Sequence, residues 1–350
     1  MRGVFRGWHG LWRFWALILL AVTGTAGTLE FLGPPLPRPP PVHTPEVAPK
    51  HEIAPKPAVI RQTPPPVVAR ADKPGRDVPG PVNDPDPALL EPVVGSVTEA
   101  LPRVAADGRK PMRYYAAGFD PTTTRPRVGL LIAGIGLSFA ESKKAIADLP
   151  GEVSLAVSPY TANPDPLLSS ARLVGHEYLL SLPMEPLHFP LNDAGPNALV
   201  TTLSPQQNQP RLIWALSRLQ GYVGATSVLG AMRGERLADM PEQMEPILAD
   251  LDQRGLMYVA GPGQKSPLPH VWSKAVDLVI DEPATAADID ARLAALEAMA
   301  RDRGSALGLA VAPRQVTVER IAAWTTGLAN RGVALAPVSA LMLPPEDKPK

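Results

Sequence analysis

The hydrophobic residues of this 350-residue chain fall into three zones. An apolar run at residues 14–22 follows a short start whose only charges are arginines. Residues 34–92 are about one-third proline, and their few apolar residues follow no helical or strand period. From residue 127 onward, short apolar runs alternate with amphipathic stretches. The pattern therefore predicts a folded domain in the last zone only.

The third zone predicts a parallel sheet. Ser138 with Glu141 three residues later, and Thr285 with Asp288, are signals for helix starts between apolar runs. Continuous apolar strands that alternate with helices are typical of a sheet covered on both faces. We expect an α/β fold, a seven- or eight-stranded (β/α) barrel, with an open doubly wound sheet as the alternative. The predicted strands are 128–133, 153–157, 178–182, 222–226, 256–260, 277–280, 306–311 and 333–336.

The first two zones predict an exported, tethered protein. Residues 1–33 are expected to form a membrane anchor, because positive charge before an apolar run keeps the N-terminus inside and exports the rest. A cleaved signal peptide is the alternative, since small residues follow the run. Residues 34–110 predict a disordered, proline-rich linker. Residues 111–345 would form the barrel domain, and 346–350 a tail.

Composition excludes several classes of site. The formal net charge is zero, so nothing indicates a nucleic-acid partner. The chain contains no cysteine, which rules out disulfides, thiolate metal sites and a cysteine nucleophile.

Three motifs point to a known family. The sequence LIAGIG occupies residues 131–136, GHEYLLSLPMEP occupies 175–186, and GVALAPVSAL occupies 332–341. Together they resemble the divergent polysaccharide deacetylase family of bacterial envelope proteins, over about residues 113–343. The resemblance implies a deacetylase-type barrel, export and a role linked to carbohydrate metabolism.

The chain departs from the family pattern at the strand ends. The family carries a pair of aspartates on its first strand, a histidine before its Leu-Pro-Met-Glu-Pro motif, another after the next strand and a third near the end. The family positions for metal and base are occupied here by Ala133, Gly134, Ser181, Val228 and Ala312.

These replacements bear directly on the chemistry that the resemblance implies. A deacetylase needs a divalent metal to polarise the acetyl carbonyl and to lower the pKa of bound water. Such a metal needs about three nitrogen or oxygen ligands. Alanine, glycine and valine offer none, so we predict no cofactor. A divalent metal such as zinc would require a rebuilt site, for instance from Glu185, His188 and Asp281.

Four side chains remain as candidates for the mouth of the barrel. Glu185 is the retained acid, either catalytic and substrate-binding or paired with an arginine as a structural group. His188, Asp281 and Arg314 are further candidates for substrate binding, although Asp281 is also placed to cap the following helix and Arg314 to lie in solvent.

The sequence supports two functional hypotheses. In the first, a catalytically degenerate module binds an envelope glycan or an envelope protein, with the barrel in the periplasm and the chain anchored once in the bacterial inner membrane. Signal cleavage would instead release the barrel into the periplasm. In the second, the chain is a metal-dependent deacetylase or hydrolase of a cell-envelope polysaccharide with a relocated site.

Overall fold

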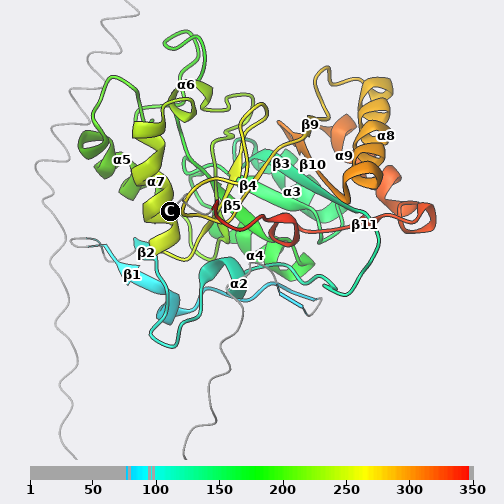
Figure 1. Cartoon of the computed structure of the whole chain (residues 1–350), viewed down its shortest axis with the longest axis horizontal. Helices are drawn as coiled ribbons and strands as arrows, with labels where there is room; N and C mark the ends of the chain where they lie inside the picture. The colour runs from blue at the N-terminus through cyan, green and yellow to red at the C-terminus, as the bar shows by residue number, and fades with distance from the viewer. Residues whose placement is uncertain (1–75, 78–79, 94–95, 97–98, 347–350) are drawn as a thin grey trace, which may run out of the picture. The chain divides into compact units, whose positions relative to one another are not determined.

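The computed structural model describes residues 76–77, 80–93, 96 and 99–346 (Figure 1). The expected anchor at 1–33, the linker up to residue 75 and the tail from 347 lie outside this range. Within the described range, no helix combines the length and apolar character needed to cross a bilayer.

A curved parallel sheet forms the centre of the described chain. Its hydrogen-bonded order is β8-β7-β6-β5-β4-β3-β10-β9, and β11 also pairs with β3. All of its pairings are parallel. The strands are β3 (Arg127–Ile135), β4 (Ser154–Val157), β5 (Tyr178–Ser181), β6 (Gly224–Thr226), β7 (Met257–Ala260), β8 (Ser273–Ala275), β9 (Leu278–Val279), β10 (Ser305–Ala310) and β11 (Ala334–Leu335).

The two ends of this sheet meet on one chain segment. Only Val276 and Asp277 separate β8 from β9. The Val276 N–H donates to the carbonyl of Ala260 in β7 at 3.0 Å, and the Asp277 N–H donates to that of Leu307 in β10 at 2.9 Å. Because this segment bonds β7 on one side and β10 on the other, the parallel sheet is curled, and this α/β fold fits the expected barrel type.

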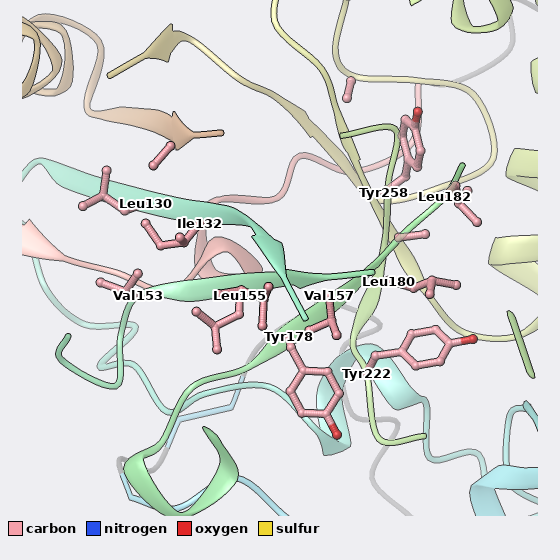
Figure 2. Packing of buried hydrophobic residues seen from close by; sticks show 14 of the residues in the cluster. Leu130, Ile132, Val153, Leu155, Val157, Tyr178, Leu180, Leu182, Tyr222 and Tyr258 are labelled. Atoms are coloured by element: carbon pink, nitrogen blue, oxygen red, sulfur yellow. The ribbon is translucent and has the colours of Figure 1, made fainter. Parts of the chain in front are cut away.

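Helices cover the outside of the barrel. Alternate residues such as Leu130 and Ile132 point outward into the larger apolar cluster, whereas Leu131 and Ala133 belong to a second cluster inside. Figure 2 shows part of the outer cluster, with side chains of β3, β4 and β5 lying side by side. The α-helices after β3 are α3 (Phe139–Asp148), α4 (Asp165–Val174), α5 (Pro205–Ser217), α6 (Glu235–Ala238), α7 (Pro241–Gln253), α8 (Ala286–Arg303) and α9 (Gln315–Thr326).

The predicted helix starts are present. The Ser138 side chain accepts a hydrogen bond from the Glu141 N–H at the start of α3, and Thr285 accepts one from Asp288 at the start of α8. Gly304 ends α8 in a left-handed conformation. The eight predicted strands all correspond to strands of the sheet. β8 was not predicted, because its sequence Ser-Lys-Ala is not an apolar run.

The described residues between Gly80 and Lys110 fold onto the amino end of the barrel, although the sequence places them in the linker. Leu89 is fully buried, and β1 pairs with β2 in an antiparallel hairpin. Arg109 forms an ion pair with Asp86 at 2.6 Å. Short strands between prolines leave little periodicity, so this part has no clear signal in the sequence. The elements of this part are η1 (Pro87–Leu89), β1 (Leu90–Pro92) and β2 (Ala100–Pro102), and the short helix α2 (Pro111–Tyr114) follows them.

The C-terminal segment closes the same end. Two short 3₁₀ helices, η2 (Ala329–Arg331) and η3 (Val338–Leu341), flank β11. Val338 and Leu341 join the interior cluster together with Leu89 and Met112. In Figure 1, β1, β2 and α2 lie on the side of the barrel opposite α6. These segments therefore cover the interior of the barrel at its amino end.

Candidate functional site

The carboxyl ends of the strands form the mouth of the barrel, where parallel α/β barrels carry their sites. Ala133 lies on β3, Ser181 ends β5, Val228 follows β6 and Ala312 follows β10. Ala133, Ser181 and Val228 are fully buried. The positions expected from the family are thus at the mouth, but they carry small or apolar side chains.

Backbone from three loops closes over this mouth. A Cβ atom built on Gly134 would lie 3.3 Å from the carbonyl oxygen of Val311, and one on Gly230 would lie 3.4 Å from Leu137 Cδ1 and 3.9 Å from the same oxygen. Gly134 also has a φ of +75°, which disfavours other residues. The segments after β3, β6 and β10 therefore meet above the barrel interior.

The donor set does not fit a divalent metal. Zinc and similar ions need about three histidine or carboxylate ligands close together. No group of three histidine, aspartate or glutamate side chains with that arrangement occurs in the part of the chain that the structure describes. The one polar side chain among the five family positions is Ser181. Its buried hydroxyl has no hydrogen-bond partner among the described residues.

Glu185 is buried, and other residues of the domain bind its carboxylate. Its Oε2 accepts hydrogen bonds from the N–H and the hydroxyl of Thr201, at 2.6 and 2.9 Å. Its Oε1 lies 3.0 Å from Arg236 Nη1, an ion pair without good hydrogen-bond geometry. The backbone of Glu185 also bonds Leu199 and Leu237. This carboxylate therefore ties the segment after β5 to α6.

Asp281 and Arg314 are brought together as a pair. Oδ2 of Asp281 lies 3.0 Å from Arg314 Nη1, and Oδ1 accepts the Val311 N–H at 2.9 Å. The Ala312 N–H also reaches Oδ2, at 3.4 Å. Burial raises the pKa of Asp281, and the bond from Val311 and the charge of Arg314 oppose that rise. Asp281 thus holds the turn after β10.

His188 takes part in neither of these carboxylate–arginine pairs. It is exposed, has a left-handed backbone with φ of 62°, and its carbonyl accepts the N–H groups of Leu191 and Asn192. Arg233 is paired with Glu282, which joins the segment after β6 to the segment after β9. The candidate residues are thus divided between Glu185 with Arg236 and Asp281 with Arg314, with His188 outside.

Sequence reasoning missed Thr201, because nothing in the chain marks it as a partner of Glu185. It also missed the exposed apolar side chains around the mouth. Leu137, Phe139, Leu187 and Leu191 are 59%, 55%, 49% and 91% exposed. Leu137 and Phe139 lie just after β3, and Leu187 and Leu191 lie in the long segment between β5 and α5.

Comparison with known proteins identifies the family. The model of the divergent polysaccharide deacetylase family matches residues 130–342. The chain is 31% identical to an uncharacterized protein of Agrobacterium tumefaciens C58, with a TM-score of 0.63, over 69% of this chain and 99% of that one.

A second solved structure is more distant. It is a putative cellobiose-phosphate cleavage protein of Enterococcus faecalis V583, at 13% identity and a TM-score of 0.45, over 63% of this chain and 100% of that one. That similarity is too weak to support an inference. No curated protein matches the chain. The family match and the first structure together show that this chain belongs to the divergent polysaccharide deacetylase family.

Proposed function

We propose that this chain is a catalytically silent family member that binds an envelope glycan or an envelope protein. The carbohydrate-related, deacetylase-like domain comes from the family. The loss of catalysis is supported above all by the five strand-end positions, where Ala133, Gly134, Ser181, Val228 and Ala312 provide no metal ligand set. No cofactor is proposed.

The retained acids support the same conclusion. A general acid or base needs an oxygen within reach of a substrate proton. Glu185 instead binds Thr201 and Arg236, and Asp281 binds two backbone N–H groups and Arg314. Each carboxylate therefore stabilises a loop of the mouth.

The test is the metal content of the full chain, purified without chelator, together with its activity on acetylated oligosaccharides. We expect less than a tenth of an equivalent of any divalent metal, on the order of contamination for a protein without a ligand set, and no deacetylation when zinc is added. Stoichiometric metal that is lost in Glu185→Gln or His188→Ala would instead support a metal-dependent deacetylase with a relocated site.

We also propose that residues 1–33 anchor the chain in the inner membrane, with the barrel in the periplasm. The apolar run after three arginines supports this orientation. Membrane fractionation of the full chain should find it in the membrane pellet. Recovery in the soluble periplasmic fraction with a shortened N-terminus would support signal cleavage.

A further inference from the structure

Several polar atoms lie buried outside the barrel interior, between the segments that follow β6 and β7. The hydroxyls of Ser227 and Tyr258 and the side-chain nitrogen of Gln264 are buried, and none of them has a hydrogen-bond partner among the described residues. Tyr258 belongs to the outer apolar cluster (Figure 2), whereas Val228 and Ala133 of the family positions belong to the inner one. Buried polar atoms of this kind are nearly always hydrogen-bonded in folded proteins, to water where protein offers no partner.

These atoms converge on Gly261, the residue after β7. A Cβ atom built there would lie 3.1 Å from Ser227 Oγ, 3.5 Å from the Arg233 carbonyl oxygen and 3.7 Å from Gln264 Nε2. Burial raises the pKa of Tyr258 to about 12, and the nearby Ser227 hydroxyl opposes that rise. The two hydroxyls are thus close, although they do not meet in hydrogen-bond geometry. We call the four residues around Gly261 the polar group: Ser227, Arg233, Tyr258 and Gln264.

Gly261 gives the polar group both its space and the orientation of one member. Its backbone is not left-handed, so what glycine provides here is room beside Ser227 rather than a special conformation. The Gly261 N–H donates to Gln264 Oε1 at 2.9 Å. Because that bond fixes the amide, its nitrogen is the atom left to donate toward Ser227.

The donors and acceptors of the polar group suit a neutral ligand. Each hydroxyl can donate or accept, the Gln264 amide nitrogen donates, and the Arg233 carbonyl accepts. A cation would face the amide N–H groups, and an anion would face the carbonyl oxygen. The Arg233 guanidinium is paired with Glu282, which balances its charge. A water molecule both donates and accepts, and a buried water typically makes about three such bonds.

We propose that the polar group binds one ordered water. This water would join the segment after β6 to the loop after β7 through hydrogen bonds to both. The segment after β6 also carries Arg236, which pairs with Glu185, so the bridge would help to position that side of the mouth. The inference goes beyond the proposed function and does not depend on it.

Two other arrangements explain the same atoms less completely. A direct hydrogen bond between the hydroxyls of Ser227 and Tyr258 would leave the Gln264 nitrogen buried without a partner. A sugar hydroxyl has the same donor and acceptor pattern as water, but a sugar ring would have to displace the loop that encloses these buried atoms.

The direct test is a crystal structure of the full chain, from crystals grown without sugar or polyol and at a resolution that shows ordered waters. We expect a water at about 2.7–3.2 Å from at least three members of the polar group. A direct bond between the two hydroxyls with no water would overturn the inference. A peak that forms only after a sugar is added would also overturn it and assign the site to a sugar hydroxyl.

Tyr258→Phe tests the same inference in solution, by urea unfolding of the full chain. If the hydroxyl binds water, its loss should lower the ratio of folded to unfolded protein about fivefold. If it has no partner, its loss should raise that ratio. Ser181→Ala is the matched control, because it also removes a buried hydroxyl without a partner and should raise the ratio.

A second variant distinguishes a shared water from a direct bond to Ser227. Tyr258 and Gln264 would bind the same water, so the effect of Tyr258→Phe should be smaller by at least about twofold when Gln264→Leu is also present. An unchanged effect in that background, or a rise in the folded fraction for Tyr258→Phe alone, would overturn the inference. Metal-dependent deacetylation would refute the proposed function and leave this water site unaffected.

Discussion

The two ends of the barrel differ in how completely their buried polar side chains are hydrogen-bonded. At the amino end, Glu177 is fully buried and accepts hydrogen bonds from the Ala117 N–H, the Ser154 hydroxyl and both the N–H and the hydroxyl of Ser339. At the carboxyl end, the Ser181 hydroxyl is equally buried, and none of the described residues bonds it.

This contrast distinguishes the amino end, which stabilises the fold, from the mouth. Glu177 links β4, β5, the C-terminal 3₁₀ helix and the segment that wraps the amino end, so it acts as a structural centre. At the mouth this role is divided, because the buried carboxylates of Glu185 and Asp281 are bonded by separate groups of residues. In a parallel barrel the amino end supports the fold while the mouth carries function.

Glu177→Ala, at the amino end, should have the largest effect on the free energy of unfolding. The change leaves several buried donors without an acceptor, and we expect the free energy of unfolding to fall by about 3 kcal/mol. Urea unfolding followed by tryptophan fluorescence measures it. A loss below that of a typical surface substitution would mean that the hydrogen-bonded centre contributes little.

Glu185→Ala makes the same substitution at the mouth. The Glu185 carboxylate accepts hydrogen bonds from Thr201 alone, and the arginine that pairs with it is exposed. We therefore expect the free energy of unfolding to fall by a smaller amount, about 2 kcal/mol. Equal losses at Glu177 and Glu185 in the same urea experiment would remove the contrast between the two ends.

Glu177→Gln tests the ionisation at the amino end. Burial raises the pKa of Glu177 above its ordinary value of 4.5, and the bonds from Ser339, Ala117 and Ser154 oppose the rise. A carboxyl group that holds its proton more tightly when folded contributes stability below about pH 4.5, and that stability is lost as pH rises through the folded-state pKa.

The parent should therefore lose stability relative to Glu177→Gln as pH rises from about 4.5, by up to about 1.4 kcal/mol for each unit of difference between the two pKa values. Unfolding of both proteins across this range measures the gap between them. A gap that stays constant would show that Glu177 has the same pKa folded and unfolded.

Ser181→Ala should have a small effect of the opposite sign. Removing a buried hydroxyl that has no partner avoids its desolvation penalty, so we expect a gain of about 0.5 kcal/mol in the free energy of unfolding. A loss of more than about 1 kcal/mol would indicate that this hydroxyl bonds an ordered water or ligand.

The exposed Leu191 should give the smallest effect on folding. Leu191→Ser should change the free energy of unfolding by less than about 0.5 kcal/mol, as surface substitutions usually do, because Leu191 is 91% exposed. Urea unfolding of Leu173→Ser, at a residue that is 75% exposed near the amino end, provides the comparison. A larger loss in Leu191→Ser would mean that Leu191 packs within the fold.

Much of the barrel could be predicted from the chain, because buried parallel strands are continuous apolar runs. All eight predicted runs are strands, and the starts of α3 and α8 follow from Ser138 and Thr285. The fold of the described residues between Gly80 and Lys110 was harder to predict, since prolines interrupt their short strands. Its burial depends on the amino end of the barrel, to which it contributes Leu89.

The alternation of strands and helices, the family, and the small or apolar residues at Ala133, Ser181 and Val228 can be read from the chain alone, because they are properties of residue type and local order. The bonds of the segment 273–279 to β7 and β10, and those of Glu185 to Thr201 and Arg236, become visible only in the folded protein. Those facts depend on contacts between residues far apart in the chain, which no local pattern records.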